Sequence, residues 1–229
     1  MLEAELLTEK SPSGTVTERC YDASAETNTW VRFDDPAVSG TPWVGVFGNA
    51  HVAFYSAAIP FDDGRHVLVI ARGQGYIVDG HTGRLVRKSP WDYSYSAVAA
   101  PGWDFVVVAD THAVWATSLD GDDRRARLVR PWFTRLDRRK QPVDPSDGEH
   151  EVVALDGIVF DAVDHDQLLG YAWWPDGWHP LHLNFEDWHM EQQDGPVSPV
   201  RDAFSARPGK GGCPTSQEYY EWMARYWLD

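Results

Sequence analysis

Cysteine is scarce in this chain, with only Cys20 and Cys213 among 229 residues. Two cysteines exclude a disulfide framework, and two alone cannot supply the four ligands of a structural zinc site. We expect both thiols to be reduced, as in a cytoplasmic protein. A single bridge that ties the two ends of the chain together is the open alternative.

Long hydrophobic runs are absent as well. The longest, residues 67–71, has the length of a β-strand, whereas a membrane-spanning helix needs about 20 apolar residues. Residues 1–10 are acidic and lack the apolar core of a signal peptide. The sequence therefore predicts a cytoplasmic protein without a membrane segment.

Positive charge is in short supply, since 20 Lys and Arg stand against 35 Asp and Glu, a formal net charge of −15. Nucleic acids and anionic membranes are bound through cationic faces, so neither is expected as a partner. Eight of the basic residues lie within 124–140, which holds only one acid, Asp137. We expect this basic stripe to be solvated or to pair with the protein's own acids. The rest of the chain is more acidic still, which leaves open a cationic partner, a neutral ligand or simple solubility.

Catalytic and cofactor signatures are missing too. Residues 207–213 contain Gly-Lys without the spacing of a phosphate-binding loop, and Gly73-Gln-Gly75 is a hairpin signal rather than a dinucleotide fingerprint. The sequence has no Gly-x-Ser-x-Gly nucleophile elbow. We therefore expect no cofactor and favour a protein that is not an enzyme.

Turn signals are abundant and closely spaced, among them Asp62-Asp63-Gly64, Asp79-Gly80 and Asp120-Gly121. Short β-branched and aromatic runs lie between them, which is typical of an all-β protein of many short strands. We expect a single β domain over residues 1–229.

The sequence also repeats itself at a spacing of about 40 residues, the length of a four-stranded propeller blade. Residues 67–91 and 105–132 both contain apolar runs, then Arg-Leu-Val-Arg, then Pro-Trp, and 152–173 is a looser third copy. This predicts a repeated antiparallel β-meander that is propeller-like. A two-sheet sandwich and a curved meander are the alternatives.

Within the first copy, residues 75–85 read Gly-Tyr-Ile-Val-Asp-Gly-His-Thr-Gly-Arg-Leu. This succession of strand, Asp, Thr-Gly and next strand resembles the blade pattern of quinoprotein-like β-propellers. The resemblance implies a propeller fold over this segment. The cofactor residues of that family have no visible counterpart in this chain, so none is carried over.

Three segments depart from the repeat. Residues 133–150 are Asp- and Pro-rich without apolar periodicity, which predicts a long loop, and 206–214 reads as a linker. Residues 215–228 begin with the capping-box spacing Thr-Ser-Gln-Glu and predict a helix packed on the β core. Its aromatic stripe consists of Tyr219, Trp222, Met223, Tyr226 and Trp227.

Tryptophan is unusually frequent, with 12 residues. Trp43, Trp91 and Trp132 each follow a proline near an expected strand end, which indicates a packing role. The richest segment is 173–189, where aromatic, histidine and carboxylate side chains alternate. The candidate binding residues are Trp174, Asp176, Trp178, His179, His182, Glu186, Asp187, Trp188 and His189.

Chelation of a metal within this segment is not expected. Strand alternation would place His179 and His182 on opposite faces, and the spacing matches no zinc signature. Aromatic side chains instead favour binding, since Trp and Tyr are frequent anchors of interfaces.

We therefore predict a non-enzymatic interaction protein that binds a cationic protein through an acidic, Trp-rich surface, in the manner of bacterial immunity proteins that neutralise basic toxins. The alternative is a carbohydrate-binding or hydrolytic protein using 173–189, which needs two converging carboxylates. Candidate pairs are Asp34/Asp35, Asp62/Asp63 and Glu186/Asp187. A scaffold domain docking through 133–150 is a third hypothesis, and the sequence predicts no oligomeric state.

Overall fold

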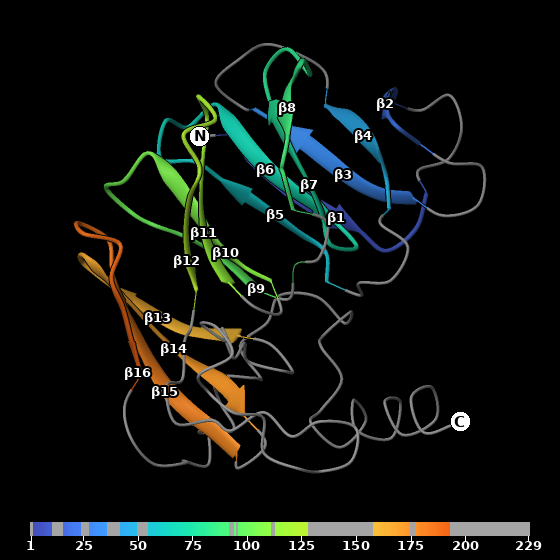
Figure 1. Ribbon diagram of the computed structural model, residues 1–229. Helices are drawn as coiled ribbons and strands as arrows, with labels where there is room; N and C mark the ends of the chain where they lie inside the picture. Colours follow the sequence, from blue (N-terminus) through green and yellow to red (C-terminus); the bar gives the residue numbers. More distant parts are fainter. Residues whose placement is uncertain are drawn as a thin grey trace, which may run out of the picture.

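The computed structural model describes residues 2–10, 16–23, 28–35, 42–49, 55–91, 94, 96–110, 113–127, 158–174 and 177–192. Over these ranges the protein is all-β, with 16 strands in four four-stranded sheets and no helix (Figure 1). The predicted all-β class is confirmed. Among these residues no helix has the length and apolarity that a membrane span requires.

The first sheet departs from a simple meander. Its strands lie in the order β1-β3-β4-β2, and β2 runs parallel to β4 at the edge, while the other pairs are antiparallel. The strands are β1 (Glu3–Leu7), β2 (Thr17–Tyr21), β3 (Asn28–Asp34) and β4 (Trp43–Gly48).

The other three sheets are antiparallel meanders with strands in chain order. The second sheet holds β5 (Ala57–Pro60), β6 (His66–Ala71), β7 (Gln74–Asp79) and β8 (Leu85–Lys88). The third holds β9 (Ser96–Ala99), β10 (Phe105–Ala109), β11 (Ala113–Ser118) and β12 (Arg124–Arg127). The fourth holds β13 (Ile158–Asp164), β14 (Gln167–Trp174), β15 (Gly177–Asn184) and β16 (Met190–Gln192).

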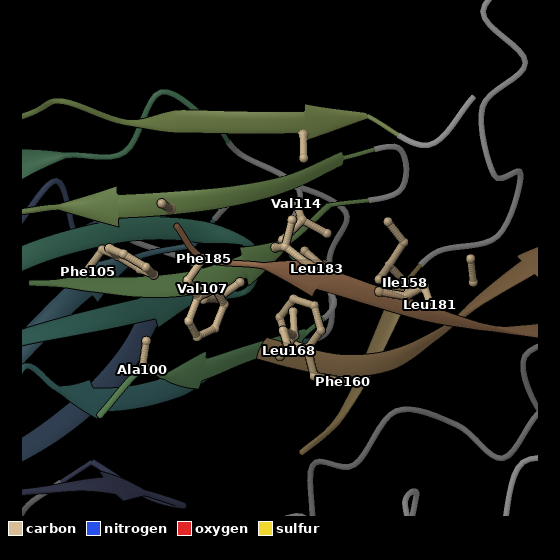
Figure 2. Packing of buried hydrophobic residues seen from close by; sticks show 14 residues of the cluster. Ala100, Phe105, Val107, Val114, Ile158, Phe160, Leu168, Leu181, Leu183 and Phe185 are labelled. Carbon is tan, nitrogen blue, oxygen red and sulfur yellow. The ribbon is translucent and has the colours of Figure 1, made fainter. Parts of the chain in front are cut away.

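Consecutive sheets stack face to face, with a hydrophobic core between each pair. Val67 and Val69 of β6 face the first sheet, whereas Leu68 and Ile70 face the third. Because the middle sheets are buried on both faces, β6 and β10 appear in the sequence as unbroken apolar runs. Figure 2 shows the core between the third and fourth sheets, where Phe105 and Val107 lie against side chains of the fourth sheet.

The first strands of successive sheets are neighbours: β1 lies against β5, β5 against β9, and β9 against β13. The four sheets therefore follow one another in an open succession (Figure 1). The described strands do not close into a barrel or a ring.

Strand β4 of the first sheet runs antiparallel to strand β7 of the second sheet, as two hydrogen bonds between their ends show. Trp43, at the start of β4, donates its indole N–H to the carbonyl of Gly80 beyond the end of β7, at 2.8 Å. Tyr76, near the start of β7, donates its hydroxyl to the carbonyl of Gly48 at the end of β4, also at 2.8 Å. Burial raises the pKa of Tyr76 to about 12, so this hydroxyl keeps its proton at neutral pH.

The second and third sheets are two copies of one pattern. Their corresponding strands begin 39 residues apart, at 57 and 96, 66 and 105, 74 and 113, and 85 and 124. The two Arg-Leu-Val-Arg segments, which start 43 residues apart, are therefore not equivalent: 84–87 overlaps β8, whereas 127–130 begins only at the last residue of β12. The repeat is real, but this tetrapeptide does not mark its register.

Trp43 and Trp91, two of the tryptophans that follow prolines, join sheets. Trp91, 4% exposed, donates its indole N–H to Thr117 Oγ1 in the third sheet at 3.1 Å. Trp43 reaches the second sheet as described above. Trp132, the predicted loop 133–150, the linker 206–214, the helix 215–228 and Cys213 lie outside the described residues, while Cys20 is exposed on β2.

Candidate functional site

The Trp- and His-rich segment occupies β14, β15 and the turn into β16. Trp174 pairs with Gly177 at one end of the β14–β15 hairpin, and the residues after Asn184 lie at the other end. From Gly177 to Asn184 the strand spans about 23 Å at about 3.3 Å per residue. The structure therefore divides the predicted cluster between two ends of the fourth sheet. Trp174 and Trp178 are placed by backbone alone, and Asp176 lies outside the described residues.

The two central histidines lie on opposite faces of β15. His179 is 2% exposed and shares the inner face with Leu181 and Leu183. His182 is half-buried on the outer face, where it lies opposite Glu191 in β16. Within the described ranges no three His, Cys, Asp or Glu side chains are grouped so as to hold a metal ion.

The turn from β15 to β16 is built by side-chain caps. Asn184 accepts the backbone N–H of Glu186 at 2.8 Å and of Asp187 at 3.4 Å through its side-chain oxygen. Asp187 in turn accepts the N–H of His189 at 3.0 Å. Trp188 has a left-handed backbone, with φ of 56°. Glu186, Asp187 and His189 are exposed as a result of this geometry.

Two aromatic residues of this turn point back into the molecule. The Phe185 ring lies edge-on to Phe105, with centroids 5.4 Å apart, and Trp188 lies edge-on to the same ring at 5.7 Å. Trp103, in the turn between β9 and β10, packs 5.7 Å from Phe185. We call Trp103, Phe105, Phe185 and Trp188 the aromatic shelf. It joins the third and fourth sheets at one end.

A basic residue covers part of the aromatic shelf. The Arg124 guanidinium lies 5.0 Å from the centroid of Phe105 and 5.2 Å from that of Trp188. It also donates to the carbonyl of Phe185 at 3.3 Å. Arg125 lies 4.8 Å from the ring of Trp115. The first two arginines of the basic stripe are thus held against aromatic rings of the protein itself.

Exposed carboxylates gather at the same end of the sheets. The turns between the first and second strands and between the third and fourth strands of each meander lie at one end because the strands alternate in direction. The hydrogen bond from Gly102 N–H to Asp62 joins two of these turns across sheets. We call their exposed carboxylates the acidic turn surface. It consists of Asp62, Asp63, Asp104, Asp120, Asp122, Asp164, Glu186 and Asp187.

Sequence reasoning identified the Asp-Gly turns but not their convergence. The turn residues 100–104, 119–123, 165–166 and 185–189 contain no Lys or Arg. Across residues 158–192 the chain carries seven Asp and Glu and no Lys or Arg. The missed signal was therefore a long stretch without positive charge, rather than a short motif.

Two basic side chains near this end, Arg65 and Arg87, are paired with acids of the protein itself. Arg65 donates to Asp79 at 2.6 Å, and Asp79 is 1% exposed. Burial acts to raise the pKa of Asp79, but hydrogen bonds from Arg65 and Thr82 outweigh it and hold that pKa well below its usual range. Arg87 makes a two-pronged pair with Asp123 at 2.5 and 2.9 Å. Since these arginines are already paired, exposed carboxylates outnumber exposed unpaired arginines at this end. Arg84 on the β7–β8 turn is exposed, and so is Arg19, which donates to the carbonyl of Thr82 in that turn.

Several carboxylates of the predicted pairs contact groups of the protein itself. Asp34 pairs with Arg32 at 3.2 Å, and Asp35 lies 2.7 Å from the His81 ring. Asp63 accepts the backbone N–H groups of residues 65 and 66, both at 2.9 Å. Burial opposes ionisation of Asp63, yet these bonds and the His66 ring lower its pKa. Asp63 therefore caps a turn, whereas Asp34 and Asp35 contact basic side chains.

Comparisons with known proteins add little. No protein-family model matches this chain, and no curated protein matches its sequence. Among solved structures it is similar to a crystal structure of the tricorn protease, with a TM-score of 0.29 and 11% identity. The match covers 74% of this chain and 15% of the tricorn protease chain. Nothing about fold or activity is transferred from a likeness this slight.

Proposed function

We propose that this protein is a non-enzymatic interaction protein that binds a cationic protein partner through the acidic turn surface. The observation that carries the proposal is the convergence of eight exposed carboxylates from five turns of three sheets at one end. A field of one sign over such an area raises the rate of encounter with a basic partner.

The internal pairing of nearby arginines supports the same function. Arg65, Arg87 and Arg124 are held by Asp79, by Asp123 and by aromatic rings, respectively. The charges of Arg65 and Arg87 are therefore balanced by acids of the protein itself, and Arg124 is held against its own aromatic rings. Immunity or inhibitor proteins that neutralise basic toxins are the biological class that we favour.

This surface differs from the segment proposed from the sequence. It retains Glu186 and Asp187 and adds Asp164 of the fourth sheet and carboxylates from the second and third sheets. It does not need His179, which is buried, or the β14–β15 hairpin end. The carbohydrate-binding or hydrolytic alternative stays a prediction that no feature of the described residues favours.

We further propose that the second, third and fourth sheets form a propeller-like arrangement. Three features support this. Each of these sheets is a four-stranded meander, and their first strands are neighbours. The strands of the second and third sheets are also related by an offset of 39 residues. The first sheet departs from the pattern of a regular propeller, because its strand β4 runs antiparallel to β7 of the second sheet.

The function is tested by binding of defined cationic probes. Lysine and arginine oligomers of equal length are titrated onto the full chain, with an aspartate oligomer as the negative probe. We expect both cationic oligomers to bind and their affinity to fall steeply between about 0.05 M and about 0.3 M salt, where the Debye length shortens to roughly half. Binding that is indifferent to salt, or equal for the aspartate oligomer, rules the proposal out.

A matched pair of charge variants locates the surface. Neutralising Asp104, Asp122 and Glu186 together, as Asp104→Asn, Asp122→Asn and Glu186→Gln, is expected to weaken binding about tenfold, since exposed charges contribute up to about 1 kcal/mol each. The control removes three exposed acids of the first sheet region, as Glu5→Gln, Glu9→Gln and Glu18→Gln. Equal weakening by both variants would show a general charge effect and contradict this surface.

A further inference from the structure

Two half-buried tryptophans lie within the acidic turn surface. Trp103 precedes Asp104 in the β9–β10 turn, and Trp188 follows Asp187 in the β15–β16 turn. Both pack against the core between the third and fourth sheets and leave part of their rings accessible. Aromatic side chains fixed in this way make good binding anchors, because little rotamer entropy is lost on contact.

The aromatic shelf already holds one guanidinium. Arg124 lies over Phe105 and Trp188 and donates to the carbonyl of Phe185, so these rings accept a planar cation in the protein itself. Trp103 belongs to the same shelf, with its ring 5.5 Å from Phe105. Within the described ranges no cation lies over Trp103.

We propose that the aromatic shelf is the centre of the binding surface and that Trp103 accepts an arginine side chain of the partner. This rests on the proposed function and names the chemical group that the surface recognises. Arg is favoured over Lys because its guanidinium is planar and weakly hydrated, and stacks on aromatic faces. Asp104 and Glu186, exposed in the adjoining turns, supply the opposite charge.

The experiment compares arginine and lysine oligomers of equal length at one salt concentration. The wild-type protein binds the arginine oligomer about threefold to fivefold more tightly, the range expected for one added cation–π contact. Trp103→Leu removes this preference, so that the arginine and lysine oligomers bind to the variant with equal affinity. Trp103→Phe, which keeps an aromatic ring, retains part of the preference and serves if the leucine variant does not fold.

Trp115 supplies the matched control. Like Trp103 it is half-buried, but its ring is already covered by Arg125, and it belongs to β11 rather than to the acidic turn surface. Trp115→Leu therefore leaves the preference for the arginine oligomer intact. Thermal unfolding of each variant establishes that it is folded.

The outcomes separate this inference from the proposed function. Salt-dependent binding of both oligomers with equal affinity in the wild type overturns the arginine assignment and keeps the proposed function. A preference that survives in Trp103→Leu, or that disappears in Trp115→Leu, also overturns it. If neither cationic oligomer binds in a salt-dependent way, the inference and the proposed function fail together.

Discussion

Arg65 and Asp79 form an ion pair at 2.6 Å in which the guanidinium is half exposed and the carboxylate is 1% exposed. The second carboxylate oxygen of Asp79 accepts the backbone N–H groups of His81 at 3.1 Å and Thr82 at 3.0 Å. One buried carboxylate thus holds the β5–β6 turn and the β7–β8 turn together. The negative charge of Asp79 is thus stabilised by Arg65 and by backbone N–H groups at a position that is almost inaccessible to solvent.

Asp79→Ala is expected to lower the free energy of unfolding by about 3 kcal/mol, because two turn N–H groups and one guanidinium lose their acceptor. Urea unfolding of the two proteins measures the difference. Asp122→Ala, in an exposed turn of the third sheet, is the control and should change stability by less than about 0.5 kcal/mol. Equal effects of the two substitutions would show that the pairing contributes nothing.

The same carboxylate predicts a dependence of stability on pH. Folding lowers the pKa of Asp79. Below the ordinary pKa of Asp, about 3.9, this carboxylate is therefore protonated in the unfolded chain but still ionised in the folded protein. Its contribution is therefore full above about pH 5 and declines as the pH falls below about 4. Wild type should lose more stability than Asp79→Asn between about pH 5 and about pH 2, as measured by urea unfolding at each pH. Parallel losses would contradict the assignment.

Arg124→Leu is expected to destabilise the junction of the third and fourth sheets by about 1–2 kcal/mol, through loss of two ring contacts and of a donor to Phe185. Arg125→Leu is the comparison, because Arg125 is exposed and covers the single ring of Trp115. Its effect should stay below about 1 kcal/mol. Chemical unfolding distinguishes the two, and a larger loss for Arg125→Leu would refute the role given to Arg124.

Gly75 lies where no side chain fits. A Cβ added there would collide with the Trp91 ring and would lie 2.8 Å from Ser89 Oγ. Gly75→Ala should therefore cost about 1–3 kcal/mol by overpacking. In the double variant Gly75→Ala with Trp91→Phe the smaller ring makes room for the added methyl group. The double variant should therefore lose less stability than the sum of the losses of the two single variants. Strict additivity in thermal unfolding would mean that the two residues do not meet.

The all-β class was predictable because the signals for it are local. Asp62-Asp63-Gly64 and Asp120-Gly121 do lie in turns, and residues 67–71 do form a strand. The register of the repeat was not predictable from Arg-Leu-Val-Arg, since an identical tetrapeptide does not fix which residues pair across a sheet. The parallel pairing of β2 with β4 was not predictable either, because it produces no local pattern in the sequence.

The candidate site was harder to predict for a related reason. Trp188 and Asp187 are adjacent in sequence, yet the ring turns inward and the carboxylate outward because of a left-handed backbone at residue 188. Asp104 and Glu186 are far apart in sequence, and their turns lie at the same end of the molecule only because the third and fourth sheets stack. Contacts between sheets depend on tertiary packing, which a linear pattern does not record.

The parallel edge strand of the first sheet has a consequence for the order of folding. Strands β5 to β8 pair only with their neighbours in the chain, so they can assemble as soon as they are synthesised. Thr17 of β2, in contrast, pairs with Trp43, and this pairing must wait for β3 and β4 and for closure of the chain between them. The N-terminal end of the protein is thus expected to complete its sheet after the segment that follows it.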